Sequence, residues 1–407
     1  MLHRRFAWLP QPCALGLGGV AASWIAAIAA AGLLTGACNP PRTASLTIPA
    51  PAAQLYASEA ADLRWHHLQA KATHNSYRPG PTAAGERIAA WRYRHRPLPE
   101  QLQVQGVRAL ELDLHWIEDA DDFPVYHERG LGVLRDDRTS CHSLERCLRQ
   151  IRGWSAAHPA HHVLFVFIQT KSMPTAPTLR RHMYARLDRI ANQALGRHLI
   201  QPAQVLAGYP HAGAVASAAA WPTLDATRGR VALVLLPHAD DNKDYLRCTH
   251  SGRRMFLAAK GDQWLQRRGH IPTEAGFVSF EDPLRYRRQV RALVRAGRLV
   301  RAHVDYFVHE RVTGDFDKLR HAQSAGVHFL TTDFPWPTSY PVPESAQSVL
   351  RRSRVAEALC QWFWVDVPGG NPSRCNPVTT GWPGCDGRRL EALGRGATLH
   401  PCATRVR

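Results

Sequence analysis

Two kinds of hydrophobic pattern alternate along this chain. Short apolar runs of the kind that form buried strands occur at His67 to Thr73, Val107 to Leu114, Pro124 to His127, Val163 to Gln169, Val231 to Leu236, Gly276 to Phe280, Leu299 to Asp305 and Val327 to Thr332. Longer stretches with apolar residues at helical spacing lie between them, at Ser143 to His158, Thr178 to Arg197, Pro283 to Gly297 and Asp315 to Gly326. Strands that alternate with helices predict a largely parallel sheet.

A doubly wound sheet and a TIM barrel both satisfy this alternation. Polar residues follow the C-terminal ends of many different strands, and this favours a TIM-like (β/α) barrel, because barrels build their active sites at that end. We expect the barrel to span residues 64–342. A tether rich in Pro, Ala, Ser and Thr is expected at 38–63, and a Gly-, Pro- and Cys-rich extension tied by disulfides at 343–407.

The N-terminus has the pattern of an export signal. Arg4 and Arg5 precede an uncharged stretch from Ala14 to Leu34, and small residues then lead to Cys38. Residues 1–37 are therefore predicted to be a lipoprotein-type signal peptide, with Cys38 acylated as the mature N-terminus. Ordinary cleavage, or retention of the stretch as a membrane anchor, are the alternatives. All three predict an exported protein, either a cell-envelope lipoprotein on the periplasmic or outer-membrane face or a secreted protein.

The chain is strongly basic. Lys and Arg total 51 against 33 Asp and Glu, which gives a formal charge of +18. Such a charge favours encounter with anionic lipids or phosphate esters as well as with nucleic acid. The arginines are scattered, and the sequence has no zinc-finger spacing, RNA-binding signature or basic heptad region, so no nucleic-acid partner is expected. Oligomeric state does not follow from the sequence.

Cysteine usage agrees with an oxidising compartment. Nine cysteines are present, and no CxxC pair suggests a metal site. Cys141 is close in sequence to Cys147, and Cys375 to Cys385, so we predict two short-loop disulfides.

The strongest candidate chemistry lies in the run Leu110 to His115. Side chains alternate across a strand, so the leucines share one face while Glu111, Asp113 and His115 share the other. Two carboxylates that face a barrel interior repel each other and are costly to desolvate unless a cation or a proton lies between them. The alternative is that each carboxylate is paired with a buried arginine.

Other polar residues follow neighbouring strands. His74 and Asn75 follow the first strand, where the imidazole suits proton transfer and the amide oxygen suits a hard cation. His127 ends a short run, although a lone histidine is more often structural. Gln169 and Lys171 place an amide oxygen and then an ammonium group at the outgoing end of a strand, and the ammonium suits a phosphate.

Taken in order, these motifs resemble the phosphatidylinositol-specific phospholipase C superfamily, above all its bacterial calcium-dependent branch. The matching stretches are THNSY at 73–77, LELDLH at 110–115, FPVYH at 123–127, the cysteine-containing stretch at 139–148, WPTL at 221–224, TTDFP at 331–335 and PGGNPSRCNPV at 368–378. The resemblance implies a barrel of the PLC-like phosphodiesterase type. It also implies that His74 and His127 act as the general acid/base pair on a phosphodiester.

The resemblance further implies that Asn75, Glu111, Asp113 and Gln169 hold Ca²⁺. The family commonly has Glu where this chain has Gln169.

Lys171 and Arg301 are the expected substrate contacts. Near Arg301, the family tends to show a second arginine at the position of His303.

We therefore expect a calcium-dependent phosphodiesterase that cleaves phosphatidylinositol or a related glycerophospholipid at a membrane surface. One alternative is a glycerophosphodiester phosphodiesterase, although its usual HRG start is absent because Asn75 and Ser76 follow His74. Another is a noncatalytic envelope lipoprotein that binds phosphorylated ligands, an interpretation motivated by Gln169 and His303.

Overall fold

The structure is a computed structural model. It describes residues 62–129, 135–236, 245–246, 252–305, 310, 314–336, 363–367, 372–380, 385 and 387–391. The predicted signal peptide at 1–37 and the lipidation site Cys38 lie outside the described residues. Leu63, one residue before the predicted start of the barrel at residue 64, is buried in the core. Within the described part of the chain, no helix has both the length and the apolar composition needed to cross a bilayer.

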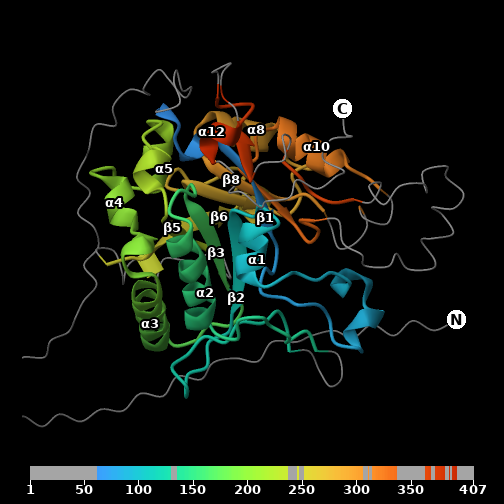
Figure 1. The fold of residues 1–407 in the computed structure, drawn as a ribbon. Coiled ribbons are helices and arrows are strands. Elements are labelled where there is room, and N and C mark those ends of the chain that lie inside the picture. The colour runs from blue at the N-terminus through green and yellow to red at the C-terminus, as the bar shows by residue number, and fades with distance from the viewer. Residues whose placement is uncertain are drawn as a thin grey trace, which may run out of the picture. The chain divides into compact units, whose positions relative to one another are not determined.

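Eight parallel strands close into a barrel (Figure 1). Their order around the barrel is β1 (Leu68–Thr73), β2 (Ala109–Leu114), β3 (Leu164–Thr170), β5 (Val231–Leu236), β6 (Met255–Lys260), β7 (Phe277–Phe280), β8 (Leu299–His303) and β9 (Phe329–Thr332). Parallel pairing of β1 with β9 closes the ring, with Lys71 opposite Leu330. The short strand β4 (Leu199–Ile200) pairs with β5, and β10 (Ser373–Cys375) pairs antiparallel with β1. The predicted TIM-like barrel is confirmed.

One of the predicted strands is wrong, and one barrel strand was missed. Pro124 to His127 makes only isolated antiparallel bridges, such as that of Val125 with Leu114, and does not join the ring. Its proline has no N–H to donate to a ladder, which suits a rim segment better than a central strand. The strand that completes the set of eight is instead β6 (Met255–Lys260), which lies between β5 and β7 in the ring. Its two alanines have low strand propensity, so its place in the sheet follows from closure of the barrel and not from local pattern.

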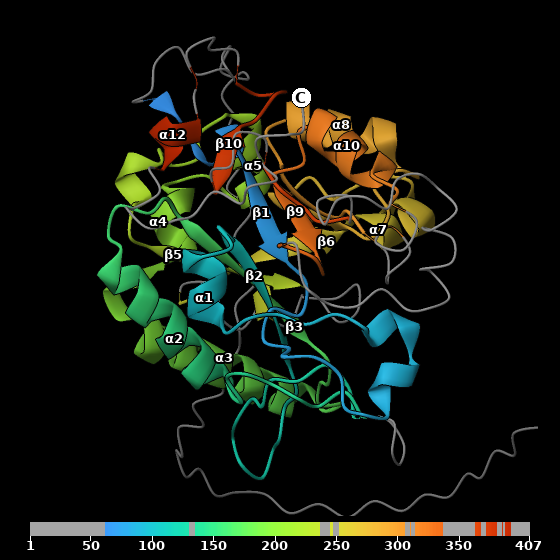
Figure 2. The ribbon, with the colours of Figure 1, turned by 45° about the vertical axis from the view of Figure 1, so that its right-hand side comes forward.

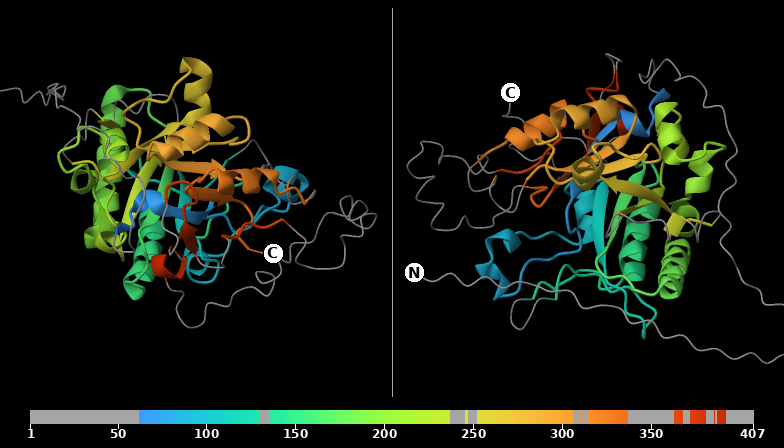
Figure 3. Two further views of the ribbon diagram at one scale, coloured as in Figure 1. Left: turned by 90° about the horizontal axis from the view of Figure 1, so that it is seen from above. Right: turned by 180° about the vertical axis from the view of Figure 1, so that it is seen from behind.

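Helices cover the outside of the barrel, as the views in Figure 3 show. They are α1 (Leu98–Gln103), α2 (Leu144–Ala157), α3 (Pro177–Leu195), α4 (Pro202–Leu206), α5 (Ala212–Ser217), α7 (Gly261–Arg268), α8 (Arg287–Arg295), α10 (Asp317–Ser324) and α12 (Gly387–Leu390). Short 3₁₀ turns are η2 (Trp65–His67), η3 (Gly85–Arg87), η4 (Ala89–Trp91), η5 (Gly196–His198) and η6 (Asp225–Thr227). The four predicted helices correspond to α2, α3, α8 and α10.

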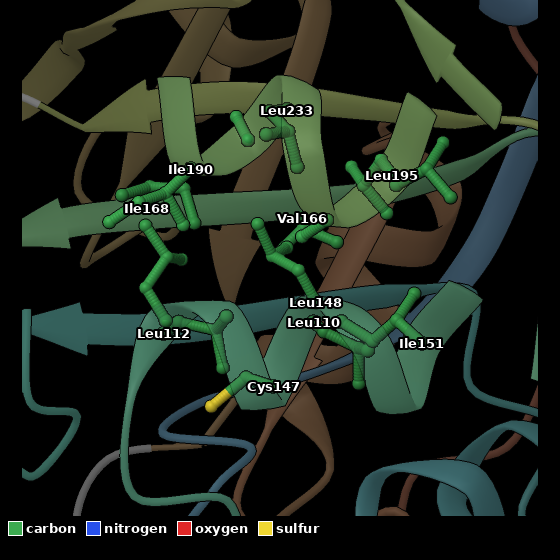
Figure 4. Close-up of a cluster of buried hydrophobic side chains, with 14 of the residues drawn as sticks. Leu110, Leu112, Cys147, Leu148, Ile151, Val166, Ile168, Ile190, Leu195 and Leu233 are labelled. Carbon is green, nitrogen blue, oxygen red and sulfur yellow. The ribbon is translucent and has the colours of Figure 1, made fainter. Parts of the chain in front are cut away.

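The alternation of β2 and β3 explains how helices pack on the sheet. Leu110 and Leu112 of β2 and Val166 of β3 point outward to meet Leu148 of α2 and Ile190 of α3 (Figure 4). The intervening residues of the same strands therefore face the inside of the barrel.

Aromatic side chains fill much of that interior. Phe165 of β3 contacts Phe329 of β9, which is not a neighbouring strand, with ring centroids 4.7 Å apart. Trp65 stacks on Trp221 at 5.6 Å and meets Phe165 edge-on. This packing fills the interior up to Phe167 and leaves the outgoing ends of the strands for polar residues.

The described parts of the C-terminal segment pack onto the barrel, so they do not form a separate appendage. Strand β10 lies beside β1 (Figure 2), and Phe363 and Val365 join the core under α8 and α10. Both predicted disulfides, Cys141–Cys147 and Cys375–Cys385, are present.

A buried ion pair attaches α12 to the start of β2. The Arg108 guanidinium donates two hydrogen bonds to the Glu391 carboxylate and lies over the Trp154 ring. Burial would raise the pKa of Glu391, but Arg108 lowers it to about 2. A depressed carboxylate pKa stabilises the fold above the ordinary value of 4.5, and that stability is lost as the pH falls through about 2.

We expect Arg108→Met to destabilise the protein by about 3–5 kcal/mol, because it leaves the Glu391 charge buried and unpaired. The double variant Arg108→Met/Glu391→Met should lose much less, since both charges are removed together. Urea unfolding of the wild type and the two variants provides the measurement. A single variant as stable as the wild type would show that the pair does not hold the C-terminal segment.

Candidate active site

The predicted site residues lie at the end of the barrel where the C-terminal ends of its strands meet. The segments that follow β1 and β2 lie at this end, and β10 and α12 lie at the opposite end (Figures 1 and 2). This is the end at which TIM barrels carry their active sites.

His74 is held by the last strand of the barrel. Its backbone N–H donates to the carbonyl of Thr332, and its Nδ1 lies 2.9 Å from Oδ1 of Asp333. Its side chain is 26% exposed, so the ring is open on one side. Burial would lower the pKa of His74, but Asp333, helped by Glu111 and Asp113, raises it to about 9. The imidazole is therefore protonated at neutral pH, with Nε2 as the nitrogen left for another partner.

His127 is also held through Nδ1 by a carboxylate, but it lies on a rim segment and not at the end of a barrel strand. The antiparallel bridges of Val125 with Leu114 and of Glu128 with Asp136 fix the rim segment that carries it. Nδ1 of His127 lies 3.0 Å from Oδ2 of Asp136, which is fully buried. The same carboxylate accepts a bifurcated hydrogen bond from Nε of Arg78, which lies 2.8 Å from each of its oxygens. Both candidate acid/base residues are thus oriented through Nδ1 by a carboxylate.

Asn75 lies in a tight turn directly after β1. Its φ of 46° is in the left-handed region, which asparagine tolerates better than most residues. Its Nδ2 donates to the hydroxyl of Tyr93 at 2.7 Å, and the Tyr77 hydroxyl lies 3.2 Å from its Oδ1. That hydroxyl is also 3.0 Å from Oδ2 of Asp113, so Tyr77 connects the amide to the carboxylate.

Glu111 and Asp113 face the barrel interior, as the sequence predicts, and each is paired with a cation. The Arg301 guanidinium donates to Oε2 of Glu111, and Nζ of Lys171 lies 3.0 Å from Oδ2 of Asp113. Burial would raise the pKa of Glu111, but Arg301 lowers it overall. The alternative of pairing with a buried arginine is therefore realised for Glu111 alone, because Asp113 pairs with Lys171, whose side chain is 23% exposed.

Asp113 remains incompletely satisfied. Its Oδ1 is buried and has no hydrogen-bond partner among the described residues. Burial raises the pKa of Asp113 despite the nearby Lys171. A buried oxygen without a partner is costly unless it coordinates an ion or a proton.

Gln169 lies opposite Asp113 in the register of β3 and β2. Partners in a parallel pair direct their side chains to the same face, so its amide shares the inner face with Asp113. Its residue is partly exposed, in contrast to its buried neighbours in β3. The oxygen atoms that could bind a cation therefore come from three elements. Asn75 lies on the loop after β1, Glu111 and Asp113 lie on β2, and Gln169 lies on β3.

These residues suit an oxygen-seeking cation such as Ca²⁺. Asp113 supplies the unpartnered oxygen, and Asn75, Glu111 and Gln169 add the neutral and charged oxygens that Ca²⁺ prefers. Arg301 engages only one oxygen of Glu111, which leaves the other for a cation.

Sequence reasoning missed the two carboxylates that orient the histidines. Asp333 directly follows β9, so the rule that polar residues at strand ends belong to the site could have found it. Asp136 lies on the rim outside the barrel strands and gave no such signal. His303 was noted only as a departure from the family, but its ring lies 4.8 Å from that of His74.

The model of a family described as Ca²⁺-dependent phosphoinositide phospholipase C matches residues 118–377. This match includes His127, Gln169 and Arg301 but begins after β2. No curated protein matches the chain.

Several solved structures are similar at low identity. A calcium-dependent phosphoinositol-specific phospholipase C from a Gram-negative bacterium, Pseudomonas sp, has 16% identity and a TM-score of 0.49, covering 69% of this chain and 93% of its own. A Ca²⁺-dependent phosphatidylinositol-specific phospholipase C from Streptomyces antibioticus has 19% identity and a TM-score of 0.48, covering 70% and 98%. A putative glycerophosphoryl diester phosphodiesterase from Silicibacter pomeroyi has 13% identity and a TM-score of 0.40, covering 70% and 94%.

We expect Asp333→Asn to lower the pKa of His74 from about 9, because burial then acts without the main opposing charge. NMR titration of the imidazole signals in chelator-treated protein measures this change. Asp136→Asn is the matched control, since it removes the carboxylate of the other histidine and should leave the pKa of His74 near 9. An unchanged His74 titration in Asp333→Asn would contradict the pairing.

Proposed function

Because the chain belongs to the Ca²⁺-dependent phosphoinositide phospholipase C family, whose model matches more than half of it, we propose that it cleaves the phosphodiester bond of phosphatidylinositol or a related glycerophospholipid. The observation that supports this most directly is the pair of partly exposed imidazoles, each held through Nδ1 by a carboxylate. This arrangement orients Nε2 of each ring for proton transfer and needs no protein nucleophile.

The two histidines divide the proton transfers between them. His127 accepts the proton of the attacking hydroxyl, which in phosphatidylinositol is the inositol 2-hydroxyl. His74 is protonated at neutral pH and donates its proton to the leaving oxygen as the P–O bond to diacylglycerol breaks. The proton lost by the nucleophile and the proton gained by the leaving group thus balance across the reaction.

Charge in the barrel mouth binds the phosphate. Lys171 is 23% exposed and so can turn from Asp113 toward an anionic substrate. Arg301 is only 2% exposed and is bonded to Glu111 and Ser279, which supports a positioning role on Glu111 in place of the predicted substrate contact. Bound Ca²⁺, held by Asn75, Glu111, Asp113 and Gln169, would lower the pKa of the attacking hydroxyl and neutralise phosphate charge.

The proposed substrate places the enzyme at a membrane surface outside the cytoplasm. The predicted export signal and the net charge of +18 support this location, since anionic lipids attract a basic protein. Cys38 would add a lipid anchor if it is acylated.

We expect His74→Ala and His127→Ala each to fold normally and to lose about 10²- to 10⁴-fold in turnover, the usual contribution of a general acid or base. The assay is release of the phosphorylated headgroup from a phospholipid panel, first with calcium and then with chelator. His182→Ala, which removes an exposed histidine paired with Asp121, is the control and should keep full activity. Near-wild-type turnover of either active-site variant would refute the assignment.

We expect Gln169→Glu to lower the calcium concentration for half-maximal activity by about tenfold, and Asp113→Asn to raise it. One added charge at ~4 Å attracts the ion by about 4 kcal/mol at an effective dielectric near 20, and desolvation of the new carboxylate offsets part of this. Calcium titrations of turnover for the wild type and both variants give the values. An unchanged titration for Gln169→Glu would mean that this side chain is not a ligand.

A further inference from the structure

His303 is the last residue of β8 and faces the candidate active site. It lies two residues after Arg301, so both side chains leave the same face of the strand. Its residue is 8% exposed, and its ring meets that of His74 edge-on with centroids 4.8 Å apart. The role proposed for the other site residues in phosphodiester cleavage does not use this imidazole.

His303 completes a cluster of possible metal ligands. One ligand atom from each of His74, Glu111 and His303 lies within 4.8 Å of the other two. Asp333 holds Nδ1 of His74, which is the usual way in which a carboxylate orients a metal-binding imidazole through its other nitrogen. Arg301 occupies one oxygen of Glu111, so the second oxygen is the one that can bind an ion.

The chemistry of this set differs from that of the proposed calcium site. Two imidazole nitrogens and one carboxylate oxygen form a typical three-ligand set for Zn²⁺, whereas Ca²⁺ prefers oxygen ligands alone. Zn–N bonds of roughly 2.0–2.1 Å in tetrahedral geometry put ligand atoms about 3.4 Å apart. The ligand atoms, now within 4.8 Å of one another, would therefore move closer by at most about 1.4 Å on binding.

We propose that His74, Glu111 and His303 form a binding site for Zn²⁺ or a similar imidazole-seeking divalent ion. An ion bound there displaces the proton that Nε2 of His74 carries at neutral pH, and it occupies that nitrogen and one oxygen of Glu111. If the proposed function is correct, the same ion inhibits the enzyme, because it blocks proton transfer by His74 and removes a ligand for Ca²⁺. The metal site itself does not depend on that function.

The direct test is calorimetric titration of Zn²⁺ into chelator-treated protein without substrate. We expect one zinc site in the wild type, and His303→Asn should weaken it by more than the roughly 10- to 100-fold known for the loss of an outer-shell partner. His270→Asn is the matched control, because His270 is exposed and its Nδ1 contacts only the nearby Arg268 carbonyl in the described structure. That variant should bind zinc as the wild type does.

A second measurement uses the wild-type protein alone, so its result does not depend on whether a variant folds. In NMR spectra of the wild type, stoichiometric Zn²⁺ should shift the imidazole signals of His74 and His303 and leave those of His270 unchanged. Equal zinc affinity in His303→Asn, or unshifted signals of His74 and His303, would overturn the site.

Turnover measurements then separate this site from the proposed function. Zinc inhibition of the wild type, weakened in His303→Asn by the same factor as zinc binding, supports both. Zinc binding by a protein that cleaves no phospholipid would keep the metal site and refute the function.

Discussion

The ion pair between Glu111 and Arg301 is the contact on which the active end of the barrel depends. Glu111 stands on β2 and Arg301 on β8, and these strands are not neighbours in the ring, so the pair spans the barrel interior. Both side chains are almost completely buried, at 3% and 2% exposure. Either charge alone would be strongly destabilising in such a place, and together they fix the two strands relative to each other.

Aromatic packing makes this contact possible. The Arg301 guanidinium lies 5.2 Å from the centre of the Phe167 ring, and that ring packs edge-on against Phe329 at 5.3 Å. These rings exclude water from below the charged residues, so the polar groups face only the open end of the barrel. Asp113 lies two residues after Glu111 on β2, and its buried Oδ1 has no hydrogen-bond partner among the described residues. Such an oxygen is costly to bury, and a bound cation would remove that cost.

The sequence predicted the fold well because the fold follows from periodicity. Alternation placed Glu111 and Asp113 inside the barrel, and the order of strands and helices placed His74 and Lys171 at its outgoing end. Contacts between distant segments could not be predicted in this way. Asp136 contacts His127 from a rim loop, and Arg301 contacts Glu111 across the barrel. Neither contact follows from the hydrophobic periodicity of the sequence. Strand β6 was missed for the same reason, since closure of the ring and not its own composition determines its conformation.

The two carboxylates that orient His74 and His127 differ in their own partners. Asp136 accepts a hydrogen bond from Arg78 as well as lying against His127, so its charge is shared between a guanidinium and an imidazole. Asp333 has no such guanidinium bond among the described contacts, and its backbone N–H is held by Asp305, whose own pKa burial raises well above its usual range. Asp333 makes the largest of the contributions that oppose burial and raise the pKa of His74 to about 9. Under the proposed function, this favours the imidazolium form that a proton donor requires.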